Sequence, residues 1–314
     1  MTNSAIMSYR QEIDTLTAID KRITEQKFFE ENIPDFVDID EGNGAWDDKI
    51  FNNQVFDNAG DGFEGFQVDV SNESRMPLVD IEIDGRLDTR EIWNKKVSYK
   101  ISDLEQVRKA IITGSNNFDI VEKKLEARKR NFDLMLQDVA FVGNKVYTNI
   151  TGLLNNSNVT VNTTDITQSI GSLSDANFNL LVGALLTSYT NNSNMSERKP
   201  NRFIVPYSDW LSLTQYNSVS FPTMSKLEYL ENVFKKATMN NDFKILPSPY
   251  AEMGGTHTYM LYKKDADNLV LDLPVSYQTT AFNTIDNFTF YNVGYGQVGG
   301  VRMLRPQTAI YFTY

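Results

Sequence analysis

The sequence predicts an α+β fold, because both strand-like and helix-like patterns occur along the chain. Apolar and polar residues alternate as in β-strands at 78–99 and again in the tail at 288–314. Between them, apolar residues recur every three or four positions through 118–142, which is typical of one long amphipathic helix. A mixed run of short elements at 173–273 completes the pattern, and 314 residues are enough for two or more core-forming units.

The first part of the chain is an acidic arm, residues 1–41, with one candidate amphipathic helix. Residues 1–90 hold 21 acidic and 8 basic side chains, whereas residues 91–314 hold 20 and 22, within a net charge of −11. Such an arm is usually solvated and loosely ordered, and the alternative is that it pairs with basic patches on a neighbouring copy. Its sign disfavours sequence-specific binding of nucleic acid.

Residues 42–76 form an extended loop rich in Gly, Asn, Asp and Phe. Gly60, Gly62 and Gly65 argue against a compact helix, so we expect a two-stranded projection with a glycine-rich tip. Because an isolated hairpin is marginal in water, its aromatic residues need a partner surface.

The remaining elements succeed one another in chain order. We expect a strand at 78–83 ended by Asp84-Gly85, a strand at 92–99, a helix with a capping box of Ser102 and Glu105 that ends at Gly114, and the long helix from Asn116 or Asn117 to a left-handed stop at Gly143. Further helices are expected near 178–186, from Ser208 and at 226–236, and strands at 202–205, 243–246, 259–262 and 269–273. The strand-like tail has no helical partner nearby and is expected to return to the strands near 78–99.

The side chains that carry catalysis are scarce. The chain has no cysteine and one histidine, which excludes thiolate chemistry and multi-histidine metal sites. His257 is expected to be a polar turn residue, and the glycines between Gly294 and Gly300 are expected to form a turn. Carboxylate pairs occur at Asp38/Asp40, Asp47/Asp48 and Asp80/Glu82, but acidic loops supply such pairs by chance.

Two further charged patterns have plain interpretations. Asp57 and Asp61 lack the spacing of a calcium loop. The basic residues between Lys123 and Arg130 read as the solvated face of the long helix, with pairing to the acidic arm as the alternative. We therefore expect no catalytic residue, no cofactor and no metal, hence no enzyme.

No secretory leader and no apolar run of the roughly 20 residues that span a bilayer are expected from the sequence. A membrane partner is therefore not expected.

The order of several short motifs resembles one family. The motifs are DIEIDG at 80–85, Tyr99-x-x-Ser102, Phe141-Val142-Gly143-Asn144, Gly152-Leu153-Leu154-Asn155, Arg202–Pro206, Tyr262-x-x-Asp265, Leu271-Asp272-Leu273-Pro274, and Gly299-Gly300-Val301-Arg302 before Pro306. From about residue 36 onward, this order resembles the major capsid proteins of tailed bacteriophages with the Hong Kong 97-type fold, which encapsulin shells share.

The resemblance implies a domain plan. Residues 1–41 would be the N-terminal arm and 42–76 the extended loop that reaches across a neighbouring subunit. Residues 77–164 and 271–314 would form a peripheral domain with a spine helix at about 117–142, and residues 165–270 an axial domain.

It also implies function. Copies would form a homo-oligomer, hexamers and pentamers in an icosahedral shell around double-stranded DNA held without sequence specificity. Scaffold, portal and cement or decoration proteins are possible partners, and the protein would belong to the virion after assembly in the bacterial cytoplasm. Two alternatives stay open: an encapsulin-like nanocompartment shell, and a carbohydrate-binding or carbohydrate-active protein using Trp46, Trp93 and Trp210.

Overall fold

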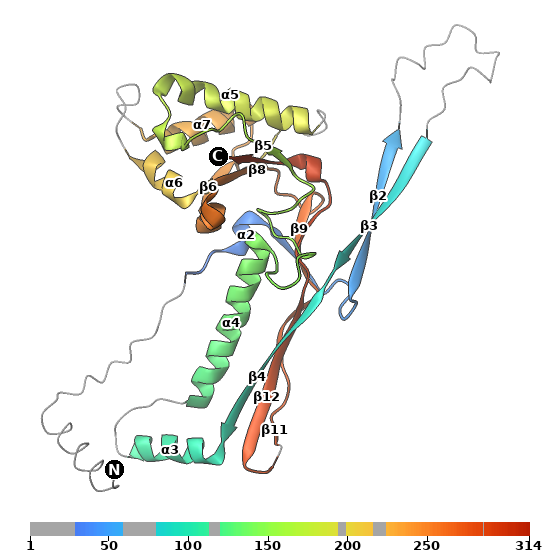
Figure 1. Ribbon diagram of the computed structural model, residues 1–314, viewed down its shortest axis with the longest axis vertical. Helices are drawn as coiled ribbons and strands as arrows, with labels where there is room; N and C mark the ends of the chain where they lie inside the picture. Colours follow the sequence, from blue (N-terminus) through green and yellow to red (C-terminus); the bar gives the residue numbers. More distant parts are fainter. Residues whose placement is uncertain (1–28, 59–79, 113–119, 194–198, 216–223, 285) are drawn as a thin grey trace, which may run out of the picture. The chain divides into compact units, whose positions relative to one another are not determined.

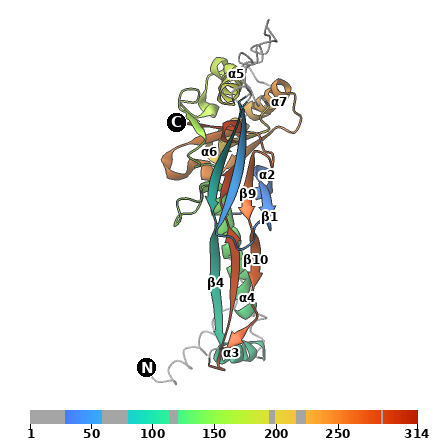
Figure 2. The same cartoon turned by 90° about the vertical axis from the view of Figure 1, so that its right-hand side faces the viewer.

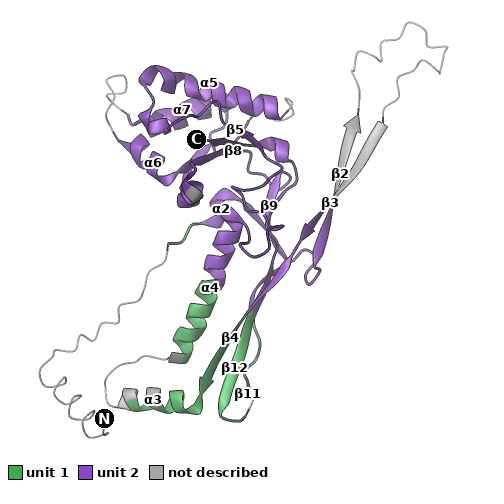
Figure 3. Ribbon diagram, viewed as in Figure 1, with its two compact units in different colours: residues 1–31, 95–131, 279–294 green, residues 32–94, 132–278, 295–314 purple. Residues whose placement is uncertain are grey.

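The computed structural model describes residues 29–58, 80–112, 120–193, 199–215, 224–284 and 286–314. Two compact units divide the chain (Figure 3): a smaller one of residues 1–31, 95–131 and 279–294, and a larger one of residues 32–94, 132–278 and 295–314. The larger unit draws on both the expected peripheral and the expected axial segments, so the compact units follow other boundaries than the domain plan.

The larger unit contains a five-stranded mixed sheet with the order β5-β14-β8-β6-β7 (Figure 1). The strands are β5 (Thr160–Asn162), β6 (Arg202–Pro206), β7 (Lys244–Ser248), β8 (Thr258–Tyr262) and β14 (Ala309–Thr313). The helices around it are η3 (Ile170–Ser172), α5 (Asp175–Asn192), α6 (Tyr207–Thr214), α7 (Lys226–Thr238), η4 (Pro249–Gly255) and η5 (Pro306–Thr308). Parallel β6 and β7 are joined through α6 and α7, as a parallel pair requires a crossover.

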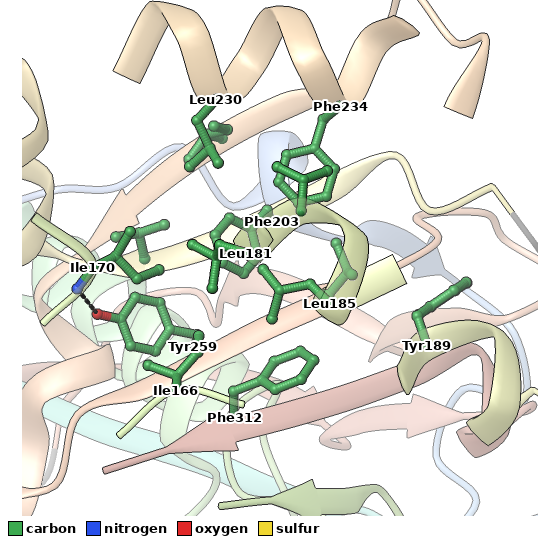
Figure 4. Close-up of a cluster of buried hydrophobic side chains, with 14 of the residues drawn as sticks. Ile166, Ile170, Leu181, Leu185, Tyr189, Phe203, Leu230, Phe234, Tyr259 and Phe312 are labelled. Carbon is green, nitrogen blue, oxygen red and sulfur yellow. Dashed lines mark hydrogen bonds between the residues drawn. The ribbon is translucent and has the colours of Figure 1, made fainter. Parts of the chain in front are cut away.

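The two faces of this sheet bury different partners, because successive residues of a strand point to opposite sides. Phe203, Tyr259 and Phe312 pack with α5 and α7 in one apolar cluster, whose side chains Figure 4 shows converging from sheet and helices. Their strand neighbours Ile204 and Met260 belong to a second cluster on the opposite face, together with the end of α4 and the segment after residue 32.

A three-stranded sheet with the order β1-β9-β13 joins the second cluster. Its strands are β1 (Asp38–Glu41), β9 (Leu269–Leu273) and β13 (Val301–Met303), and the short helix α2 (Ile33–Phe36) precedes β1. β1 lies parallel beside β9 (Figure 2), and β13 is antiparallel to it. The ring of Phe36 packs edge-on against Phe141 at 4.9 Å, and Tyr262 Oη donates to the Phe36 carbonyl over 2.7 Å, so the start of this segment is anchored.

The long helix α4 (Ile120–Val142) ends in a complete cap. Gly143 has φ +76°, which confirms the expected left-handed stop, whereas Asn116 and Asn117 lie outside the described residues. The last four carbonyls each accept a hydrogen bond: Val139 O from Gly143 N (3.1 Å), Ala140 O from Leu153 N (2.8 Å), Phe141 O from Leu154 N (2.9 Å) and Val142 O from Asn155 Nδ2 (2.6 Å). The Gly-Leu-Leu-Asn turn therefore satisfies the groups that a helix end leaves without partners.

The smaller unit combines α3 (Ile101–Ile112) and the start of α4 with parts or all of four strands. These are β4 (Glu91–Lys100), β10 (Val275–Thr279), β11 (Asn283–Thr284) and β12 (Thr289–Val298), of which β10, β12 and β11 form a sheet and β4 pairs with β12. Tyr99 lies between the rings of Phe282 and Phe290, 5.7 Å from each. The expected return of the tail to the early strands is confirmed for β12. It is wrong for β13, which pairs with β9, and for β14, which pairs with β8 and β5.

The expected capping box of Ser102 and Glu105 is wrong. Helix α3 begins at Ile101, so Ser102 is already helical, and Asp103 accepts the backbone N–H of Lys100 over 3.1 Å. Asp103 therefore supplies the cap from the third helical position, and its negative charge suits that end of the helix.

A long antiparallel hairpin completes the larger unit. β2 (Lys49–Asn58) pairs with β3 (Asp80–Thr89) over their whole length, and the two form a sheet of their own. The expectations that both arms fall within 42–76 and that Asp84-Gly85 ends a strand are wrong, because β3 continues through Gly85 opposite Asn53. The glycine-rich tip lies outside the described residues.

Gly152→Ala tests the helix cap. A Cβ at Gly152 would lie 2.5 Å from the Gly143 nitrogen, so the substitution pushes the capping turn away and should lower the unfolding free energy by about 1–3 kcal/mol. The control is Gly183→Ala inside α5, where a Cβ meets nothing within 4 Å and should raise it by up to about 1 kcal/mol. Urea denaturation of dissociated subunits measures both, and equal effects would contradict the cap.

Candidate interaction site at the root of the hairpin

A buried arginine–aspartate pair joins the root of the β2/β3 hairpin to the three-stranded sheet. Arg90 lies between the end of β3 and the start of β4, and Asp272 belongs to β9. Nε and Nη2 of Arg90 donate to Oδ2 and Oδ1 of Asp272 over 2.6 and 2.8 Å. The two side chains are 0% and 1% exposed. A two-pronged pair withdrawn from water fixes both distance and angle, so it sets the place where the hairpin leaves the sheet.

A second arginine extends this pair to the neighbouring strands. Arg302 of β13 donates through Nη1 to Asn52 Oδ1 of β2 over 3.0 Å. Its Nη2 donates to Asp40 of β1 and lies 3.7 Å from Asp272 Oδ1. Arg90, Asp272, Arg302 and Asp40 together form the ion-pair cluster. Its two positive and two negative groups compensate one another's charge inside a region of low polarity.

The turn between β12 and β13 reaches this cluster only because it carries glycine. A Cβ at Gly299 would lie 2.3 Å from Asp272 Oδ2, and Gly299 N donates to the Asp272 carbonyl over 2.9 Å. The turn expected between Gly294 and Gly300 is confirmed at Gly299 and Gly300, which close over the buried carboxylate, and is wrong for Gly294 and Gly296, which lie in β12.

The hairpin exposes an apolar pair. Phe51 and Leu87 lie directly opposite each other in the β2/β3 register, and 59% and 53% of their surfaces are exposed. Two cross-strand neighbours of this kind form a contiguous apolar surface on one face of a two-stranded ribbon. Such a ribbon gains little stability alone, so this face suits contact with another surface.

An apolar hollow of about 240 Å³ lies elsewhere in the larger unit. Trp93, Met135, Val139, Tyr147 and Ile150 contribute to its lining. The polar groups in its lining do not include an acid and a base that could act together. The hollow therefore suits an apolar side chain better than a reacting substrate.

The basic stretch of α4 is only partly solvated. Arg128 is buried in the smaller unit, where Nη1 donates to Oδ1 and to the carbonyl oxygen of Asn292 over 2.8 and 3.1 Å. The expected solvated face is therefore wrong for Arg128, which holds β12 against the helix. Lys129 is exposed, and Lys123 pairs with Glu126 over 2.9 Å.

The carboxylates of one expected pair, Asp38 and Asp40, are both engaged in ion pairs that hold strands. Asp38 pairs with Lys264 over 3.0 Å, Asp40 belongs to the ion-pair cluster, Asp47 and Asp48 are exposed, and the side chains of Asp80 and Glu82 lie outside the described residues. The calcium-loop comparison made for Asp57 and Asp61 is not tested, because Asp61 and the side chain of Asp57 lie outside the described part of the chain. Across the described ranges, no three His, Asp or Glu side chains converge to hold a metal ion.

His257 lies in the connection between η4 and β8, where a polar turn residue was expected, and its side chain takes part in a polar network. Its Nδ1 lies 3.4 Å from Oδ2 of the buried Asp209, and its ring stacks on Tyr314 at 4.8 Å. Asp209 also accepts the hydroxyls of Ser169, Tyr259 and Tyr314. Burial and the charge of Asp209 raise the pKa of Tyr314 to about 12, and burial and the Asp209 hydrogen bond raise the pKa of Tyr259, so both remain protonated donors at neutral pH.

The three tryptophans do not form one surface. Trp93 packs against Phe132 at 5.2 Å, Trp210 is half-buried against the cluster under α5, and Trp46 is exposed in the loop before β2. The structure therefore gives no common platform for a sugar chain. In the described part of the chain, no helix has the length and apolar character to cross a bilayer.

Comparison with known proteins identifies the fold. A family model described as "Major capsid protein" matches residues 70–314. The capsid of Myoviridae phage XM1 is similar with a TM-score of 0.75 at 15% identity, over 96% of this chain and 97% of that one. The capsid of a native GTA particle gives 0.61 at 11% identity, over 100% and 99%. A virus-like particle from Pyrococcus furiosus gives 0.50 at 10% identity, over 90% and 92%.

No curated protein sequence matches this chain. At these identities the structural likeness establishes the fold alone, and the α+β, Hong Kong 97-type capsid fold predicted from the sequence is confirmed.

Arg90→Ala tests the ion-pair cluster. Removing Arg90 leaves Asp272 buried without its two-pronged partner and leaves Arg302 to face both Asp40 and Asp272, so the unfolding free energy should fall by about 3–5 kcal/mol. Arg86→Ala is the matched control, because the Arg86–Asp88 pair on β3 is partly exposed and should contribute about 0–1 kcal/mol. The double variant Arg90→Met with Asp272→Leu should be less destabilised than Arg90→Ala. If both arginine variants unfold alike in urea, the buried pair does not fix the hairpin root.

Proposed function

Since the chain belongs to the major capsid protein family, we propose that its copies assemble as hexamers and pentamers into a closed icosahedral shell around double-stranded DNA. The protein is a capsid component of the virion. Beyond this role, we propose the hexamers and pentamers, the enclosed DNA and the surfaces through which the copies contact one another.

The β2/β3 hairpin carries the proposal. Its root is fixed by the ion-pair cluster, while Phe51 and Leu87 on its strands remain exposed. A fixed root with an uncovered apolar face is suited to contact with a neighbouring copy, and burying it there removes apolar surface from water. Because each copy offers the same hairpin and receives another, the contact repeats around a ring and closes it.

Function therefore resides in surfaces rather than in a reaction. The charged groups in the interior of the larger unit are committed to holding strands, as Arg90 and Asp272 are, or to the network around Asp209. We propose that the protein has no enzymatic activity and needs no cofactor or metal.

The net charge of −11 supports loose confinement of DNA. A strongly basic lining would neutralise phosphates and hold the polymer tightly, whereas an acidic subunit leaves DNA free to leave the shell. Contact with DNA would then be independent of sequence. Scaffold, portal and cement or decoration proteins are the other proposed partners, and assembly would take place in the bacterial cytoplasm.

A nanocompartment with protein cargo is the alternative within the same fold. The virus-like particle from Pyrococcus furiosus matches with a TM-score of 0.50, against 0.75 for the phage XM1 capsid. The two functions differ in contents, so particles from the cells that naturally make the chain distinguish them. Nuclease-protected DNA of genome length supports the viral shell, and particles filled with protein but free of DNA contradict it.

Phe51→Asp tests the role of the hairpin. A charge on its apolar face should oppose docking on the next copy, so the yield of shells in negative-stain images should fall at least about tenfold, corresponding to about 1.4 kcal/mol per contact. Circular dichroism and urea denaturation check that the dissociated subunit remains folded. Met239→Asp is the control, since Met239 is 84% exposed and lies outside the hairpin. Normal shells from folded Phe51→Asp subunits would contradict the assigned contact.

A further inference from the structure

We propose that the loop of residues 42–48 is a docking site for a basic side chain of a second copy of this chain. In this assignment Trp46 receives the cation on its indole face, and the carboxylates of Asp47 and Asp48 flank it. The inference rests on the proposed shell assembly and adds to it a second contact, separate from the apolar face of the hairpin.

The backbone of Trp46 is the first observation. Trp46 has φ +73°, a left-handed conformation that bulky residues rarely adopt, and 54% of its surface is exposed. The exposure of this large apolar side chain and the unfavourable conformation of its backbone each lower the stability of the fold. Residues of this kind persist where the surroundings impose them, and they are frequent at binding sites.

The loop is rigidly held beneath the indole. Trp46 N donates to Oε1 of Gln297 over 2.7 Å, and Nε2 of Gln297 donates to the Asp47 carbonyl over 2.8 Å. Gln297 is fully buried, and Arg90 Nη1 donates to the Gly44 carbonyl over 2.8 Å. The ion-pair cluster therefore also positions this loop. Such an anchor loses little conformational entropy on binding, which is the property of residues that dominate an interface.

The chemistry around the indole selects a cation. Residues 38–48 contain five carboxylates and no basic side chain, and Lys49 follows at the start of β2. Asp38 and Asp40 are engaged by Lys264 and Arg302. Three other carboxylates of this segment, on Glu41, Asp47 and Asp48, are exposed.

The ring of Tyr295 lies 5.7 Å from Trp46 and supports one side of the indole. An aromatic face beside carboxylates attracts lysine or arginine through the ring quadrupole and through charge.

The same chain supplies basic residues of matching charge around the start of α4, of which Arg128 is buried. Residues 95–131 contain ten basic and five acidic side chains. One lysine of this stretch already lies over an aromatic ring, since Lys96 Nζ is 4.2 Å from the centroid of Tyr291. Lys129 is exposed on α4. A contact between the loop of one copy and Lys129 of the next joins two different patches, as a ring or shell of identical subunits requires.

Cross-linking tests the assigned partner without background, because the chain has no cysteine. The variant carries Asp48→Cys and Lys129→Cys, and assembled particles are treated with a short bis-maleimide. We expect covalent dimers and longer ladders on a denaturing gel. The control pairs Asp48→Cys with Lys244→Cys, which places the second cysteine at an exposed position of β7. Particles without a ladder, a ladder equal to that of the control, or a link within one chain would each overturn the proposal.

Trp46→Ala provides an independent readout. Removing the indole should lower the resistance of the particles to denaturant and reduce the association constant per contact about threefold. Trp46→Phe keeps an aromatic ring and should retain part of the attraction for the cation. Charge reversal at one side, Asp48→Lys, should weaken particles further, and adding Lys129→Asp should restore them. If a glycan restores the stability of the variant particles, or if the cysteine variant links to a different protein, the loop binds another ligand and the proposal is overturned. If shells form normally and these variants change nothing, this contact fails while the shell function stands.

Discussion

The Arg90–Asp272 ion pair is the interaction on which the larger unit depends. Two opposite charges with almost no exposure lose their hydration, and only good geometry and further hydrogen bonds compensate for that loss. The structure supplies both through two N–H···O bonds and through Arg302 on the other side of the carboxylate. Because any slip of a strand would leave a buried charge without its partner, the cluster selects one register of the hairpin root.

The C-terminal end of α4 likewise has hydrogen-bond partners for its backbone carbonyls. Each of the last four carbonyls of α4 has a donor, and the close approach of Gly143 and Gly152 lets the capping turn supply them. The alternation of the five-stranded sheet then divides the core into one cluster under α5 and α7 and another against the end of α4. These elements hold the body of the subunit together, and the apolar pair on the hairpin remains exposed to a neighbour.

Local patterns predicted α4, α5 and the strands β6 to β9, because hydrophobic periodicity and turn residues are read within a short window. The site could not be predicted in this way, since Arg90 and Asp272 are 182 positions apart and nothing nearby distinguishes Arg90 from the partly exposed Arg86. Asp84-Gly85 has the composition of a turn, yet tertiary pairing with β2 keeps it in a strand. The capsid fold was predicted from the order of the motifs along the chain, because that order reflects the whole arrangement of elements and a single residue does not.

The most direct test of the central claim is a reconstruction by electron cryomicroscopy of the assembled particle. We predict a closed shell in which each β2/β3 hairpin lies on the adjacent subunit, with Phe51 and Leu87 covered and Arg90 still bonded to Asp272. A shell in which the hairpin lies against its own subunit, or in which Phe51 and Leu87 remain in solvent, would contradict it.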